Sequence, residues 1–79
     1  MTAFNLKINQ TAKIVSVSAM GAERQRLNSL GIVRGQLIKI LAFSLFSGSV
    51  LIACGQVRVA IRKSLAKKIK VEYENSFGR

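Results

Sequence analysis

Two glycines four residues apart, Gly31 and Gly35, place the strongest constraint on how this chain can fold. Leu27 and Leu30 give the segment before them one apolar side, as a short amphipathic helix has. Gly31 follows directly, where a helix commonly ends on a residue with positive φ, which glycine adopts without steric cost. Gly35 then precedes residues 36–40, an apolar run typical of a strand. The pattern therefore predicts a short helix, a tight turn and a β-strand.

Hydrophobic alternation and turn residues predict the remaining elements. The expected strands are residues 14–19, 36–43, 50–54, 56–61 and 68–73, and the expected helical segments are residues 22–30 and 64–67. Gly55 predicts a tight connection between the third and fourth strands. A meander of five short strands, with one short helix between the first two, removes its exposed edges by curling into a small β-barrel. The predicted fold class is therefore mainly β.

The same alternation predicts which side chains face the core. Residues 56–61 should have one buried face and one wet, basic face. The side chains expected to point inward from the last strand are Ile69, Val71 and Tyr73. The side chains expected on the outward face of strand 36–43 are Leu37, Lys39, Leu41 and Phe43. A short edge strand is also predicted near the N-terminus, from the alternation of Phe4, Leu6 and Ile8.

The charge of the chain is strongly unbalanced. Thirteen lysines and arginines face three glutamates, so the net charge is +10 on 79 residues, a length that predicts one domain. Such a positive potential suits three kinds of partner: nucleic acid, an anionic membrane surface or an acidic protein. No apolar run approaches the ~20 residues that a membrane-spanning helix needs. Cys54 has no second cysteine for an intrachain disulfide, so the expected location is a reducing cytoplasm.

Side chains suited to catalysis or metal binding are scarce. The chain has no histidine, the usual general base near neutral pH. Its carboxylates, Glu23, Glu72 and Glu74, and its one thiol are not clustered as ligands of a transition metal would be. Cys54 ends an apolar strand and is interpreted as a small core residue. Gly31 and Gly35 follow a helix, whereas phosphate-binding glycines precede one. We therefore predict no catalytic residue, metal site or cofactor.

Two sets of side chains are candidates for binding a partner. The basic set is Arg24, Arg26, Arg34, Arg58, Arg62, Lys63 and Lys67. Its alternative interpretation is a solvated face that keeps a small protein soluble. The apolar set, at the predicted turn of residues 44–49, is Phe43, Leu45 and Phe46. It is either an exposed patch for a partner or for self-association, or a hairpin that folds over the barrel to complete the core. The glycines assigned to structural turns are Gly31, Gly35 and Gly55.

Four motifs, taken in order, resemble one known family. They are Ala-Lys-Ile-Val at 12–15, Arg-Gln-Arg-Leu-Asn-Ser-Leu-Gly-Ile-Val-Arg-Gly at 24–35, Val-Arg-Val-Ala-Ile-Arg-Lys-Ser-Leu-Ala at 57–66, and Ile-Lys-Val at 69–71. The ordered set, which spans about residues 7–73, is similar to the ferrous iron transport protein A (FeoA) family. The resemblance implies an SH3-like β-barrel in the cytoplasm. It also implies an accessory of FeoB, the membrane ferrous iron transporter whose cytoplasmic part contains a GTPase domain.

Two other functions fit parts of the sequence. A small basic barrel can bind nucleic acid, although base stacking needs aromatic side chains displayed on a strand face. The aromatic residues here are scattered, and no strand presents two at a spacing of two. The family also resembles the regulatory barrels of metal-dependent repressors, but this chain shows no accompanying helix-turn-helix. An accessory protein that binds its partner through a basic and apolar surface is the preferred hypothesis.

Overall fold

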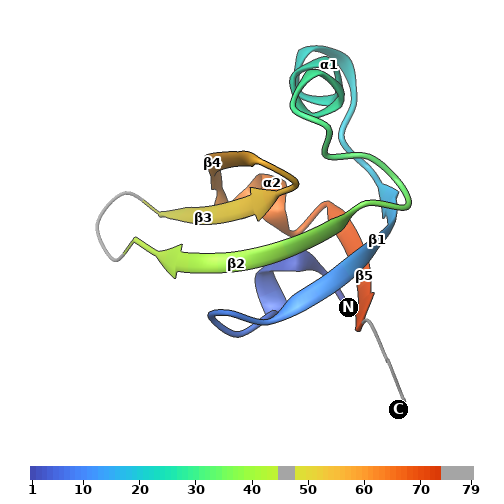
Figure 1. Cartoon of the computed structure of the whole chain (residues 1–79). Helices are drawn as coiled ribbons and strands as arrows, with labels where there is room; N and C mark the ends of the chain where they lie inside the picture. Colours follow the sequence, from blue (N-terminus) through green and yellow to red (C-terminus); the bar gives the residue numbers. More distant parts are fainter. Residues whose placement is uncertain (45–47, 74–79) are drawn as a thin grey trace.

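The computed structural model describes residues 1–44 and 48–73. Its elements are η1 (Ala3–Asn5), β1 (Thr11–Val17), α1 (Gly21–Ser29), β2 (Leu37–Phe43), β3 (Ser49–Cys54), β4 (Val57–Arg62), α2 (Lys63–Ala66) and β5 (Ile69–Tyr73). The five strands form one antiparallel sheet in the order β4-β3-β2-β1-β5, and α1 lies at one end of it (Figure 1). These features confirm the prediction of a mainly β fold with one short helix between the first two strands.

The sheet curls around a core built largely from isoleucine. Its largest fully buried side chains are Ile14, Leu27, Ile32, Ile38, Ile40, Ile52, Ile69 and Val50. The hydrogen-bonded ladder stays open between β4 and β5, and α2 connects these two strands across the opening. The alternation predicted for residues 56–61 is confirmed, because Ile61 is buried while Arg58 and Arg62 are exposed. Burial of β-branched side chains from every strand therefore holds the sheet in its barrel-like curve.

Glycines end α1 and turn the chain into β2. Gly31 has φ +82° and donates its N–H to Asn28 O at 3.0 Å, while Ile32 donates to Leu27 O at 2.9 Å. This pair of bonds is a Schellman motif, and the burial of Leu27 and Ile32 supplies its hydrophobic contact. Gly35 has φ +92° and closes the next turn, in which Gln36 N–H donates to Val33 O at 3.1 Å. The predicted helix end and turn are confirmed.

Three predictions about side-chain placement were wrong. Residues 3–5 form a 3₁₀ turn instead of an edge strand, because the Asn5 side chain accepts the Thr2 N–H at 2.9 Å and caps it. Leu6 is buried there, whereas Ile8 is 52% exposed. Tyr73 is 47% exposed, since it pairs with Ala12 at the end of the sheet and lies beyond the core. The third error concerns Phe43.

A β-bulge in β2 turns Phe43 toward the core. Ile40 pairs with Ile52 and Ala42 pairs with Leu51, so Leu41 is the extra residue. The bulge shifts the alternation by one residue, and Phe43 therefore shares a face with Ile40. Phe43 pairs with the buried Val50 and packs against the core. The prediction that Phe43 points outward with Lys39 is wrong for this reason.

The two edges of the sheet differ. At the β5 edge, Val71 N–H donates to Met1 O at 2.9 Å and Thr2 forms a bridge with Lys70. The N-terminal residues thus cover part of this edge. At the other edge, β4 pairs with β3 alone among the described residues. The fold therefore leaves one strand edge open beside α1 and α2.

Candidate docking surface

The fold gathers most of the predicted binding residues into small groups. Arg26 and Arg62 meet at one groove, Arg24 and Arg34 meet at a second hollow, and Phe43, Lys63 and Lys67 converge on Phe4. Arg58 lies apart on β4, exposed, after the turn at Gly55 and Gln56. Leu45 and Phe46 lie outside the described residues. Positions far apart in the sequence are thus brought together by the curl of the sheet.

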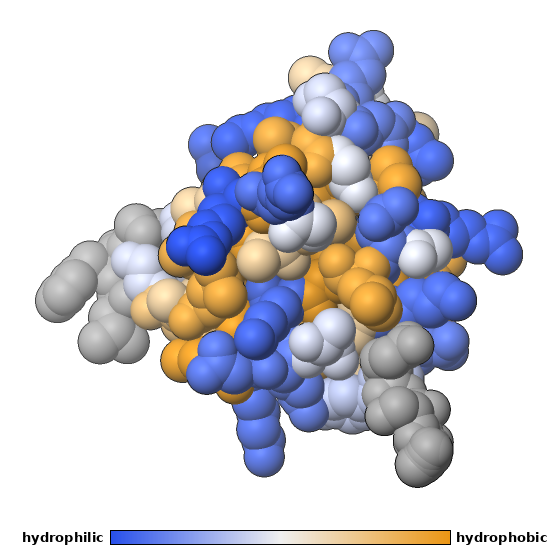
Figure 2. All heavy atoms as spheres, in the orientation of Figure 1, coloured by the Kyte–Doolittle hydropathy of each residue, from blue (hydrophilic) through white to orange (hydrophobic). Residues whose placement is uncertain are grey.

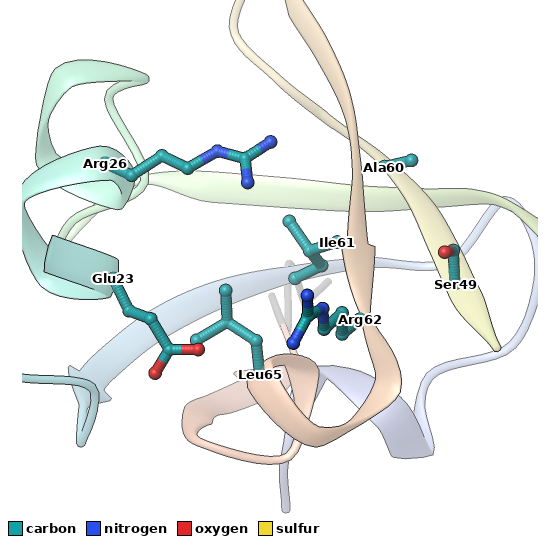
Figure 3. Close-up of a pocket in the computed structure, with 7 residues that line it drawn as sticks. All are labelled: Glu23, Arg26, Ser49, Ala60, Ile61, Arg62 and Leu65. Atoms are coloured by element: carbon teal, nitrogen blue, oxygen red, sulfur yellow. The ribbon is translucent and has the colours of Figure 1, made fainter. Parts of the chain in front are cut away.

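The first group lines a groove of about 380 Å³ between α1 and the β4–α2 corner, here named the arginine groove. Its lining residues are Glu23, Arg26, Ser49, Ala60, Ile61, Arg62 and Leu65. Figure 3 shows Arg26 reaching from α1 toward β4, with Ile61 and Leu65 forming the apolar part of the lining. Figure 2 shows the same mixture on a larger scale, with hydrophilic side chains projecting around apolar areas of one face. The groove combines an apolar lining with cations from two separate elements.

The positive charge in the arginine groove is largely uncompensated. Its one carboxylate, Glu23, accepts a hydrogen bond from Lys68 Nζ at 3.3 Å, and both side chains are partly exposed. Such a surface pair contributes about 0–1 kcal/mol. Within residues 1–44 and 48–73, no ion pair involves Arg26 or Arg62. Both guanidinium groups therefore remain available to a carboxylate from another molecule, which they can bind in a bidentate manner.

Another group surrounds an aromatic side chain and is named the Phe4 cluster: Phe4, Phe43, Lys63 and Lys67. The rings of Phe4 and Phe43 meet edge to face, with centroids 6.2 Å apart. Lys63 Nζ and Lys67 Nζ lie 5.9 and 5.1 Å from the Phe4 centroid, within the range of cation–π attraction. Because Arg62 and Lys63 are consecutive, this cluster meets the arginine groove at the start of α2.

Arg24 and Arg34 lie around the other side of α1. A hollow of about 200 Å³ is lined by Val15, Ser16, Val17, Arg24, Asn28, Val33 and Arg34. Arg24 Nη1 donates a hydrogen bond to Val17 O at 3.2 Å, which ties α1 to the end of β1. The guanidinium group of Arg24 is thus engaged in a hydrogen bond within the fold, whereas that of Arg26 has no ion-pair partner among the described residues.

Cys54 is built into the structure as a core side chain. It is 5% exposed, and its Sγ donates a hydrogen bond to Gly31 O at 3.4 Å, so it links the end of β3 to the end of α1. Burial raises the pKa of the Cys54 thiol. The thiol is therefore protonated at neutral pH. A soft metal ion or an electrophile reacts with the thiolate form instead.

We expect Cys54 to be alkylated slowly in the native protein. Burial restricts access, and the raised pKa lowers the fraction of thiolate, so modification by iodoacetamide at about pH 8 should be at least about tenfold slower than in urea. Mass spectrometry over time measures both rates. The raised pKa also means that the unfolded state releases this proton first, so the thiol's contribution to stability is lost as the pH rises through the alkaline range. Equal alkylation rates with and without urea would contradict the burial of Cys54.

Three features of this surface have no clear signal in the sequence. Phe4 reads as one residue of an alternating segment, yet it is the ring beneath two lysines. Glu23 and Leu65 line the arginine groove, although neither stands in a recognisable motif. The order of the strands, which leaves β4 at an edge, also depends on pairings distant in sequence.

None of the helices in the described residues has the length and apolar character required to cross a membrane. Over the same residues, no three side chains among histidine, cysteine, aspartate and glutamate lie together as a metal site would require.

Comparison with known proteins identifies close structural relatives. A FeoA protein from Chlorobium tepidum superposes with a TM-score of 0.88 at 32% identity, covering 95% of this chain and 71% of that chain. A zinc-complexed FeoA from Stenotrophomonas maltophilia gives a TM-score of 0.75 at 32% identity, covering 91% of this chain and 89% of that chain. That protein is described as a prokaryotic SH3 domain protein and a candidate ferrous iron transport activating factor.

A manganese-dependent transcriptional repressor shares the fold alone, with a TM-score of 0.79 at 19% identity over 90% of this chain and 39% of that chain. The search of curated proteins gave no match. The SH3-like character predicted for the fold is confirmed by the similarity to the Stenotrophomonas maltophilia protein. The family model of the FeoA domain matches residues 1–73, a range that includes the motifs noted in the sequence. The chain therefore belongs to the FeoA domain family.

Proposed function

We propose that this protein is a non-catalytic accessory of ferrous iron uptake that docks on the cytoplasmic part of the transporter FeoB and modulates it. The observation that carries the proposal is the arginine groove, where Arg26 and Arg62 stand over Ile61 and Leu65 without a carboxylate partner among the described residues. Family membership supports a role in ferrous iron transport. On this proposal the protein acts in the cytoplasm and reaches the inner membrane only through its partner.

The composition of the groove suits a protein partner. Arginine is enriched in the centres of protein interfaces, where it combines charge with a flat apolar surface. A net charge of +10 also raises the rate of encounter with an acidic surface. The proposal of a non-catalytic role rests on the lack of histidine and on the setting of Glu23, which is engaged with Lys68. Docking would modulate FeoB only through a difference in affinity between two states of the transporter.

The decisive measurement is the affinity for the isolated cytoplasmic domain of FeoB at two salt concentrations. Because exposed charges are screened within about 10 Å at 0.1 M salt, raising the salt from about 50 to about 300 mM should weaken binding by about tenfold or more. Isothermal titration calorimetry gives both values of Kd. Absence of binding at both salt concentrations would refute the proposal. Tight binding of a short single-stranded oligonucleotide at physiological salt would instead favour a nucleic-acid partner.

A further inference from the structure

The outer edge of β4 presents backbone groups that the sheet does not use. The β3–β4 hairpin closes with a two-residue turn at Gly55 and Gln56, in which Cys54 pairs with Val57. In such a hairpin the closing pair exchanges hydrogen bonds, and the direction of the backbone groups then alternates along the strand. Lys63 N–H continues the alternation, because it donates to Gly48 O on the β3 side at 2.9 Å.

The residues whose backbone points away from β3 are Arg58, Ala60 and Arg62. In the part of the chain that the structure describes, no other strand pairs with this edge. The opposite edge of the sheet is different, since Met1 O accepts the Val71 N–H there. An edge left open beside a groove is a site where an extended segment can add to the sheet.

The arginine groove gives such a segment a place to lie. Ala60, Ile61 and Arg62 are consecutive residues of β4, and all three line the groove. The opposite side is formed by Glu23 and Arg26 of α1. Side chains of an added strand would alternate between the face of Ile61 and Leu65 and the face of the exposed Arg58 and Arg62.

Charge selects the kind of segment. If a second copy of this chain paired antiparallel through β4 about Ala60, Arg58 of each copy would lie opposite Arg62 of the other. Like charges directly opposite one another destabilise such a pair. An acidic segment would instead meet Arg58 and Arg62 on one side and Arg26 across the groove. The charges therefore favour an acidic partner over self-association.

From these observations we infer that β4 binds an extended acidic segment of the protein partner, which adds to the sheet as a sixth strand. The segment alternates acidic and apolar side chains, so that carboxylates face the arginines and apolar groups face Ile61 and Leu65. This inference rests on the proposed docking to FeoB and specifies how the contact is made. The backbone edge supplies affinity that does not depend on side-chain identity, and the arginines supply the preference for acid.

Amide hydrogen exchange tests the inference directly. NMR would follow exchange in the full chain alone and in complex with the cytoplasmic domain of FeoB. The amides of Arg58, Ala60 and Arg62 should exchange at least about tenfold more slowly in the complex, because each gains a hydrogen-bond partner. The amides of Val57, Val59 and Ile61 are an internal control, since they already face β3 in the free protein.

The outcomes separate the inference from the proposed function. Binding without slower exchange at Arg58, Ala60 and Arg62 would overturn the β4 inference while leaving docking intact. No binding at all would overturn both. Slower exchange of these amides with the oligonucleotide, but not with FeoB, would show that a different class of partner uses the edge.

A pair of variants at Ala60 provides a second readout. Ala60→Pro removes the outward N–H and should weaken binding by about tenfold. The fold should accept this change, because proline is tolerated in edge strands. Ala60→Val keeps this N–H but changes a side chain that lines the groove, so its loss of affinity should be several-fold smaller than that of Ala60→Pro. Circular dichroism confirms that both variants fold. Equal affinities for the two folded variants would argue against strand addition.

Discussion

Replacing Ile52 with alanine is expected to lower the free energy of unfolding by about 3 kcal/mol. Ile52 is 0% exposed and lies on the inner face of β3, where it pairs with Ile40 on one side and Val59 on the other. The loss is large for this chain, because a protein of 79 residues has a total stability of roughly 4–12 kcal/mol. The melting temperature should fall by about 12–24 °C, as measured by circular dichroism or calorimetry.

The matched control for this prediction is Leu37→Ala. This substitution removes a similar amount of hydrocarbon, but the Leu37 side chain is 45% exposed and lies on the outer face of β2. Its replacement should cost less than about 1 kcal/mol, because little apolar surface returns to water. Similar falls in melting temperature for the two variants would contradict the assignment of Ile52 to the core.

Reversing both charges of the arginine groove is expected to weaken binding to the cytoplasmic domain of FeoB by about 30-fold or more at low salt. The variant is Arg26→Glu with Arg62→Glu, which places two carboxylates where an acidic partner would approach. Both residues are exposed and neither belongs to an ion pair of the described residues, so the fold should keep its melting temperature within a few degrees. Calorimetric titration measures the change in Kd.

A second double variant separates local contact from total charge. Lys7→Glu with Lys39→Glu also changes the net charge by four units, from +10 to +6, on exposed residues outside the groove. It should weaken binding by no more than about threefold, through slower encounter alone. Equal losses for the two double variants would show that net charge, and not the arginine groove, determines the interaction.

Local chemistry made much of the fold predictable. Gly31 and Gly35 each require positive φ, and the structure uses both in the turns expected of them. The alternation of residues 56–61 was equally direct, because side chains of a half-buried strand point in turn toward the core and toward solvent, with a repeat of two residues. The FeoA resemblance arose from the order of such local signals, and the family match confirms it.

Features that depend on pairing between strands were harder to predict. The bulge at Leu41 inserts one residue into β2 and reverses the face of everything after it, so alternation alone placed Phe43 on the wrong side. The 3₁₀ turn at residues 3–5 depends on one hydrogen bond from Thr2 to the side chain of Asn5. Neither event leaves a hydrophobic repeat that distinguishes it from a plain strand.

The candidate site followed the same division. Arginine in a basic stretch indicated contact with a partner, and both Arg26 and Arg62 lie in the groove. Their proximity, however, comes from the curl of the sheet, which brings α1 beside β4. The engagement of Arg24 with Val17 O could not be read from its residue type either. The sequence therefore indicated which kinds of side chain to consider for binding, and the structure shows which of them lie near one another.

The attachment of α1 has a consequence for how such a protein diversifies. Of the residues of Gly21–Ser29, all of which are described, Leu27 alone is buried. The outward positions of this helix can accept new side chains at little energetic cost, since exposed substitutions usually change stability by less than about 0.5 kcal/mol. In this nine-residue helix the position that is packed into the core is thus separate from the exposed positions that a docking partner would contact. Homologous chains could therefore diverge in the partners they bind while they keep the same barrel.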